Sequence, residues 1–254
     1  MSVATSREEY DFIKYGSSPF ARHDAETGAA YGVDMPPFLP TGESPVRYLN
    51  NWGLFKLKNF VAAHCVQVDD DDIAILAEND VAVAHCARAN AKLSVGVAPV
   101  AAFLRAGLRV GLGTDSPAAS DGMDMFDEMR ISLLMQRSTG VHGFLTTQEM
   151  IHLATLGAAR ALRMDDRIGS LEVGKEADII AVDLHNSHQR PLHDPNTAIV
   201  HSSNQDNTRM TMVHGRLLYD DKDGIGQGHC SGVDPFEVRA RAEDLRLKVR
   251  GKHK

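Results

Sequence analysis

The sequence has few cysteines and no long apolar run, and each absence narrows the classes of protein it can belong to. Three cysteines in 254 residues are too few, and odd in number, for a disulfide framework, which indicates a reducing compartment. No run approaches the roughly 18 apolar residues of a membrane-spanning helix, and no secretory signal peptide opens the chain. We therefore expect a soluble, cytoplasmic protein with no membrane partner.

The sequence also lacks any strong concentration of basic charge. Its net charge of −7 is spread along the chain, so the electrostatic footprint of a nucleic-acid-binding protein is absent. One dense acidic run, Asp69–Asp72, directly precedes an apolar segment. We interpret it as a solvated helix start, where acidic side chains interact favourably with the helix dipole.

Short apolar runs alternate with helical patterns in the first part of the chain. Strand-like and helical segments follow one another in the order 59–65, 69–79, 81–86, 97–107, 108–116 and 124–138. The strand-like segments are apolar on both faces, which is typical of strands covered by helices on both sides. The alternation predicts an α/β fold with a parallel sheet.

The second part of the chain has a different character. Residues 147–164 predict one or two helices, Ile179–Val182 predicts a strand, and residues 209–220 predict a hairpin around His214–Gly215. These pieces indicate a small β appendage, followed by a charged helix. We also expect residues 16–48, which are rich in glycine, proline and serine, to form an irregular loop. The resulting division is an α/β part at 1–165, a β part at 166–222 and a charged helical tail at 223–254.

Three polar residues end successive apolar runs. His64 and His85 end the first two runs, and Asp115 follows the third. Because the carboxyl ends of parallel strands meet at one edge of a sheet, these side chains are expected to lie near each other. Imidazole and carboxylate groups suit zinc, which lowers the pKa of bound water to about 7.

Taken singly, each of these signals also has a structural interpretation. A histidine at a strand end is often a hydrogen-bonded structural residue, and an aspartate in "GTDS" is often a turn or cap residue. The "GLG" at 111–113 is a poor phosphate loop because it lacks a third glycine, which counts against a free-standing nucleotide-binding module. Cys65 and Cys86 are expected to be packing residues because paired C-x-x-C spacings are absent.

Four separated blocks of the sequence resemble the amidohydrolase superfamily. They are "VAAHCVQVDDDDIAILAENDVAVAHCARANAKLSVGVAPV", "VGLGTDSPAASDGMDMFDEMR", "VGKEADIIAVDL" and "PLHDP". The sequence is most similar to the zinc-dependent deaminase and chlorohydrolase branch, which includes S-adenosylhomocysteine/methylthioadenosine deaminases. The resemblance implies the C-terminal part, about strands five to eight, of a (β/α)8 TIM-type barrel, together with part of a small β-sandwich.

The resemblance also implies roles for individual residues. Asp115 matches the strand-eight aspartate that binds the metal and takes the proton of the attacking water. His64 matches the strand-six histidine that hydrogen-bonds this water. His85 and Asn90 fall in the strand-seven block and are expected to line the substrate pocket. The implied cofactor is zinc, with iron or another divalent metal as an alternative.

Other metal ligands of the family are missing from the sequence. The family binds zinc with an H-x-H pair on strand one and a histidine on strand five, and no H-x-H occurs here. The strand-five block is altered in "MSVATSREEYDF". Met1 and Ala4, or Ser2 and Thr5 in the alternative register, replace its histidine and glutamate.

Four histidines in a loop could indicate a second metal site. His185, His188, His193 and His201 lie in a polar stretch of the second part of the chain. They are consistent with a second metal site, but we interpret the stretch as a polar connection between the two parts.

We expect a metal-dependent hydrolase of C–N bonds, most consistent with a deaminase of an adenine-type nucleoside or related purine. The alternative is a non-catalytic remnant, or one half of a split barrel enzyme, inactive alone. Three or four βα units cannot close an eight-stranded barrel, so the chain is expected to need the missing N-terminal half or to self-associate. The segment at 21–42 is expected to shape the pocket rim.

Overall fold

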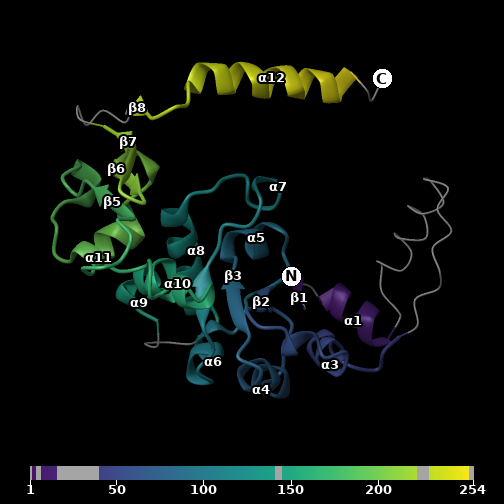
Figure 1. Ribbon diagram of the computed structural model, residues 1–254. Helices are drawn as coiled ribbons and strands as arrows, with labels where there is room; N and C mark the ends of the chain where they lie inside the picture. The colour runs from purple at the N-terminus through teal and green to yellow at the C-terminus, as the bar shows by residue number, and fades with distance from the viewer. Residues whose placement is uncertain (1, 4–6, 16–39, 141–144, 222–228, 252–254) are drawn as a thin grey trace.

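The computed structural model describes residues 2–3, 7–15, 40–140, 145–221 and 229–251 of the chain (Figure 1). Most of the predicted loop at 16–48 and of the rim segment at 21–42 lies outside these ranges. The end of the predicted loop was wrong, because a helix begins at Pro45. Ser44 caps this helix by accepting a hydrogen bond from the backbone N–H of Arg47, and proline is favoured in the first helical turn.

The first sheet is parallel, as predicted, and follows the order of the chain. Strand β2 pairs with β1 on one side and with β3 on the other, and β3 pairs with β4. Within the described ranges this sheet consists of β1 (Ser2–Val3), β2 (Val61–His64), β3 (Ala82–His85) and β4 (Val110–Leu112). Because neighbouring strands run in register, the carboxyl ends of β2, β3 and β4 lie at the same edge.

Helices connect and cover these strands (Figure 1). The predicted helices at 69–79, 97–107 and 124–138 are confirmed as α4, α6 and α8, whereas α5 and α7 were not predicted. The helical segments of this part are α1 (Arg7–Tyr15), α3 (Pro45–Asn51), η1 (Leu54–Lys56), α4 (Asp70–Glu78), α5 (Ala87–Lys92), α6 (Val100–Arg105), α7 (Pro117–Ser120), α8 (Met125–Ser138), α9 (Thr147–Ala154) and α10 (Leu156–Ala161).

The core lies between this sheet and its helices. Val83 and Val110 from the sheet, Phe103 from α6, Leu133 from α8 and Met150 from α9 are all buried in it. Burial of a side chain of this size stabilises the folded state by about 1.5–3 kcal/mol relative to exposure. The core therefore holds β3 and β4 against α6, α8 and α9.

The second sheet is antiparallel. The hairpin predicted around His214–Gly215 is confirmed, and both turn residues have positive φ, as a type I′ turn requires. Strand β8 comes from the range that we assigned to the tail. The elements of this part are β5 (Ile179–Val182), η2 (Ser187–Gln189), α11 (Pro195–Thr197), η3 (Ala198–Ser202), η4 (Gln205–Asn207), β6 (Thr208–Val213), β7 (Arg216–Asp220) and β8 (His229–Cys230).

The last helix, α12 (Pro235–Gly251), stands apart from both sheets (Figure 1). Ion pairs four residues apart, such as Arg241–Glu237 and Lys248–Asp244, stabilise it along its length. None of the helices in the described ranges has the length and apolar character needed to cross a membrane.

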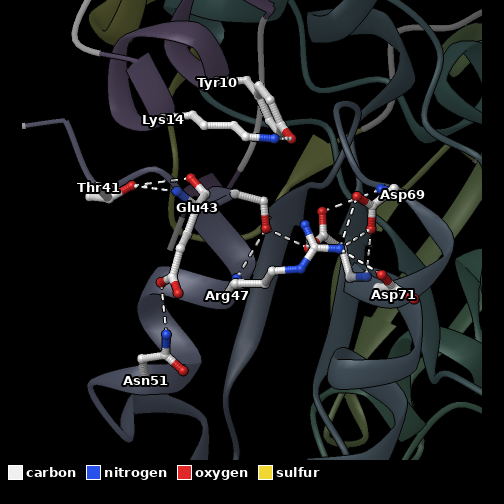
Figure 2. A network of polar contacts seen from close by, with 10 residues as sticks. Tyr10, Lys14, Thr41, Glu43, Arg47, Asn51, Asp69 and Asp71 are labelled. Carbon is white, nitrogen blue, oxygen red and sulfur yellow. Dashed lines mark hydrogen bonds and ion pairs between the residues drawn. The ribbon is translucent and has the colours of Figure 1, made fainter.

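The acidic run at the start of α4 is only partly a solvated helix start. Asp69 caps the helix, but Asp72 is fully buried, so the prediction was wrong for this residue. Ser44 Oγ donates a 2.5 Å hydrogen bond to Asp72, and burial raises the pKa of the Asp72 carboxyl. Figure 2 shows Arg47 pointing toward Asp69 and Asp71, and its guanidinium also lies 3.5 Å from Asp72. The run therefore fastens α3 to α4.

Candidate active site

The residues predicted from strand ends lie at one edge of the parallel sheet. His64 is the last residue of β2, His85 is the last residue of β3, and Asp115 follows the end of β4. His64 and Asp115 both have positive φ, 70° and 58°. Non-glycine residues in this region cost about 1–3 kcal/mol and persist where the surrounding structure holds them. The chain therefore bends away from the strand direction at both residues.

The structure brings three of the predicted residues together. His64 Nε2 lies 3.7 Å from Asp115 Oδ2, and His64 Nδ1 lies 2.9 Å from Asn90 Oδ1. Asn90 belongs to α5, the helix that directly follows β3. The imidazole of His64 is thus held between an amide on one side and a carboxylate on the other.

The orientation of the Asn90 amide favours one tautomer of a neutral His64 ring. With the amide oxygen toward the ring, Nδ1 donates to Asn90 Oδ1, because an amide oxygen can only accept, and the lone pair is then on Nε2. This lone pair faces the carboxylate of Asp115. Two facing acceptors suit a third group that brings a proton or positive charge, such as a water molecule or a metal ion.

His85 lies deeper than His64. It is 1% exposed, and neither ring nitrogen has a hydrogen-bond partner among the described residues. Burial lowers the pKa of His85 to about 4, with a smaller contribution from the charge of His64. His85 is therefore neutral near pH 7 and has unused hydrogen-bonding capacity at the end of β3.

A cluster that could hold a metal is not formed by the described residues. Within residues 2–3, 7–15, 40–140, 145–221 and 229–251, no group of three or more histidine, cysteine or acidic side chains is arranged so that it could hold a metal ion. Neither the strand ends nor the loop histidines form such a group. His185, one of the loop histidines, contacts Asp183 instead. The predicted loss of the strand-five histidine and glutamate rests partly on Met1, Ala4 and Thr5. These residues lie outside the described ranges.

Comparison with known families identifies the chain. Residues 40–218, which include both strand-end histidines and Asp115, match the family described as "Amidohydrolase family". The chain belongs to the amidohydrolase family. The resemblance inferred from the four sequence blocks is confirmed.

Curated relatives of this amidohydrolase include nucleoside deaminases. The 5-methylthioadenosine/S-adenosylhomocysteine deaminase of Symbiobacterium thermophilum is 43% identical over 182 residues, covering 71% of this chain and 42% of that protein. The protein of the same name from Moorella thermoacetica is 35% identical over 230 residues, covering 85% of this chain and 52% of that protein. The amidohydrolase chain thus spans about half the length of these relatives.

Solved structures with a similar fold contain zinc. An adenosine deaminase from Xanthomonas campestris with bound zinc has a TM-score of 0.76 and 29% identity, over 91% of this chain and 49% of that chain. Atrazine chlorohydrolase from Arthrobacter aurescens, complexed with zinc, has a TM-score of 0.70 and 26% identity, over 87% and 46% of the two chains. These similarities support an α/β fold of the TIM-barrel type found in metal-dependent hydrolases for this amidohydrolase.

One buried acid of this amidohydrolase was missed by sequence reasoning. Glu128 of α8 is fully buried, and one of its carboxyl oxygens accepts a 3.2 Å hydrogen bond from the backbone N–H of Arg88. The signal was present in the sequence, because Glu128, Ser132 and Gln136 form a polar row at four-residue spacing. All three are buried on the same face of α8. The prediction at 124–138 is of a helix alone, with no role for this row.

Burial raises the pKa of Glu128 to about 7, from an ordinary value of 4.5. The backbone N–H groups of Arg88 and Ala87 and the charge of Arg88 act in the opposite direction, and Asp115 adds to the rise. Between pH 4.5 and about 7, the folded state therefore binds more protons at Glu128 than the unfolded state does. The stability that the protonated carboxyl contributes is complete below pH 4.5 and is lost as pH rises through about 7.

We expect Glu128→Gln to remove this loss of stability, because glutamine does not titrate. At about 1.4 kcal/mol per pH unit, the unfolding free energy of the wild type should fall relative to that of E128Q by roughly 3 kcal/mol from pH 4.5 to 8. Urea unfolding at several pH values measures the difference. Ser132→Ala, a buried neighbour on the same face of α8, is the control, since serine cannot titrate. A difference between wild type and E128Q that does not change with pH would contradict the prediction.

Proposed function

We propose that this amidohydrolase chain carries the second half of the active site of a metal-dependent deaminase acting on an adenine-type nucleoside. The observation that carries the proposal is the pairing of His64 with Asp115 at the carboxyl edge of the parallel sheet. The deaminases among its relatives and structural neighbours support the reaction type. In this proposal β1, β2, β3 and β4 correspond to strands five to eight of a (β/α)8 barrel.

The residues of this chain have separate roles in the proposed reaction. Hydrolytic deamination adds water to the ring carbon and releases ammonia. Asp115 Oδ2 takes the proton of the attacking water, and His64 Nε2 hydrogen-bonds this water and orients it. His85 and Asn90 contribute to the substrate pocket. His85 stays neutral at physiological pH because burial lowers its pKa to about 4, so its ring offers one donor and one acceptor, neither of which has a partner among the described residues.

The described residues fit only part of a zinc site. Catalytic zinc has three protein ligands, typically nitrogen or oxygen donors, and an open position. Asp115 supplies a carboxylate, but no group of three donors forms within the described ranges. Zinc binding therefore requires ligands from outside the described residues.

The incomplete zinc site favours a second candidate function. A chain whose described residues do not assemble a three-ligand metal site is also consistent with a non-catalytic remnant of this fold. The two candidates differ in whether a complementary chain restores activity.

Zinc content and ammonia release together test both candidates. The purified 254-residue chain is analysed for zinc per chain and incubated with 5-methylthioadenosine. The assay is repeated after mixing with the part of the Symbiobacterium thermophilum relative that this chain does not match, and that fragment alone is the control. Zinc and ammonia release that appear only in the mixture support half of a split deaminase. About one zinc per chain and ammonia release without the fragment support a self-sufficient enzyme, whereas no ammonia in either preparation supports a remnant. Chloride release from atrazine, without ammonia release, would contradict the proposed reaction.

A further inference from the structure

We propose that Glu128 is a positioning residue that fastens the start of α5, and thereby holds Asn90 and His64 in the orientation that faces Asp115. The inference rests on the proposed function only in taking the His64–Asp115 pair as the reacting pair. The contacts that carry it come from three separate elements, α8, α5 and β2.

The start of α5 lacks a cap of its own. Its N-cap residue, Cys86, makes no side-chain hydrogen bond to the helix. The first N–H groups of a helix have no partner within the helix and need one from outside when they are buried. Here Glu128 of α8 accepts from the backbone N–H of Arg88, and the N–H of Ala87 also hydrogen-bonds its carboxylate. An acid from a neighbouring helix thus takes the place of a capping side chain.

The helix that Glu128 fastens carries the residue that orients His64. Asn90 is 1% exposed and lies in the same short helix as Arg88. Its Oδ1 accepts from His64 Nδ1 at 2.9 Å, and the opposite nitrogen of the ring faces Asp115 at 3.7 Å. A shift or rotation of α5 moves Asn90 Oδ1 away from Nδ1. Either nitrogen of His64 could then carry the proton, and the lone pair on Nε2 would no longer be guaranteed.

The contacts of Glu128 also explain how a buried acid is tolerated at this place. A buried carboxyl costs free energy unless it is hydrogen-bonded. One oxygen of Glu128 has a partner, whereas the second oxygen is buried with none among the described residues. A purely apolar side chain would fill the same space in α8 without this cost, but it would leave the start of α5 without an acceptor.

The tautomer of His64 provides a readout that requires neither metal nor substrate. In a chain labelled with 15N-histidine, long-range 1H–15N correlation spectra distinguish Nδ1–H from Nε2–H rings, and the spectrum of His64→Gln identifies the signals. We expect the wild type to show the Nδ1–H form at His64 and Glu128→Met to show a mixture of both forms. Glu128→Gln should retain the Nδ1–H form because its amide oxygen still accepts from the backbone of α5. Ser132→Ala is the matched control on the same face of α8 and should not change the tautomer.

Two outcomes would overturn the inference. One is an unchanged His64 tautomer in E128M when Asn90→Ala does change it. The other is rapid hydrogen exchange of the Arg88 amide in the wild type, which is measurable even if E128M does not fold. We expect this amide instead to exchange at least a hundredfold more slowly than an exposed amide.

In an active preparation, E128M should lower kcat about 10–100-fold, with KM little changed. Because the tautomer and exchange measurements do not depend on turnover, a chain that never releases ammonia can still confirm or overturn the role of Glu128. Conversely, an active chain with an unaltered tautomer in E128M would overturn the positioning role and leave the proposed function standing.

Discussion

Asp115→Asn is expected to lower ammonia release at least a thousandfold in any preparation of this amidohydrolase that is active. Asparagine has nearly the same shape, and it tolerates the positive φ of 58° at this position as well as aspartate does. Its amide oxygen can also keep the 2.6 Å hydrogen bond from the backbone N–H of Ser116. The substitution removes the ability to take a proton, and general-base groups contribute about 10²–10⁴-fold. It also removes the carboxylate that Asp115 would offer to a metal.

The control for this substitution lies nearby on the same side of the sheet. Asp121 ends α7, is exposed and pairs with Lys92 at 2.7 Å. Asp121→Asn removes an equal charge close to the site and should change ammonia release less than twofold, since exposed ion pairs contribute little. If D115N kept more than a tenth of the wild-type rate while remaining folded, Asp115 would not be the proton acceptor.

Gly111→Ala is expected to destabilise the fold by about 3 kcal/mol, a large effect for a single methyl group. Gly111 lies in the middle of β4, directly against α10. A Cβ atom at this position would lie 2.7 Å from the Cα atom of Ala158 and 3.1 Å from its Cβ atom. The obstacle is the backbone of α10, so no change of rotamer relieves it, and the helix or the strand must move. The movement would disturb the buried packing of Val110 in the core.

Gly113 provides a matched control two residues further along the chain. Its added Cβ atom would meet only the sulfur of Cys86 at 3.5 Å, an ordinary contact distance. Gly113→Ala should therefore change stability by less than about 1 kcal/mol, helped by the lower entropy of the unfolded chain. Urea unfolding of both variants measures the difference. Equal stabilities of G111A and G113A would show that α10 does not press on β4 as the structure indicates.

The role of Gly111 in "GLG" could not be predicted from the neighbouring residues. As a phosphate loop the motif is incomplete. In the structure, Gly111 of β4 lets the strand lie close to Ala158 of α10, which is 47 residues later in the chain. No pattern near Gly111 indicates this partner, because contacts between distant segments arise only when the chain is folded.

For the acidic residues too, local features could be predicted and contacts between distant segments could not. The run at Asp69–Asp72 indicated a helix start, which is confirmed, because capping depends on neighbouring residues alone. The burial of Asp72 depends on Ser44 and Arg47 from another helix and was not predictable from the run itself. Likewise, the pattern at 124–138 predicts the helix that carries Glu128, but the contact of Glu128 with α5 joins residues 40 positions apart.

The sequence by itself determined the alternation of β2, β3 and β4 with α4, α6 and α8, and the residues that end these strands. Apolar runs, capping residues and turn residues act over a few positions, so these features are local. Parallel pairing then requires that strand ends share an edge, which is why His64, His85 and Asp115 could be grouped in advance.

Only the tertiary structure decided which nitrogen of His64 faces Asp115 and what holds it there. That orientation depends on Asn90, 26 residues further along the chain, and on the contact between α8 and α5. Hydrogen bonds between buried groups are set by the packing of whole elements, and packing is a property of the folded chain.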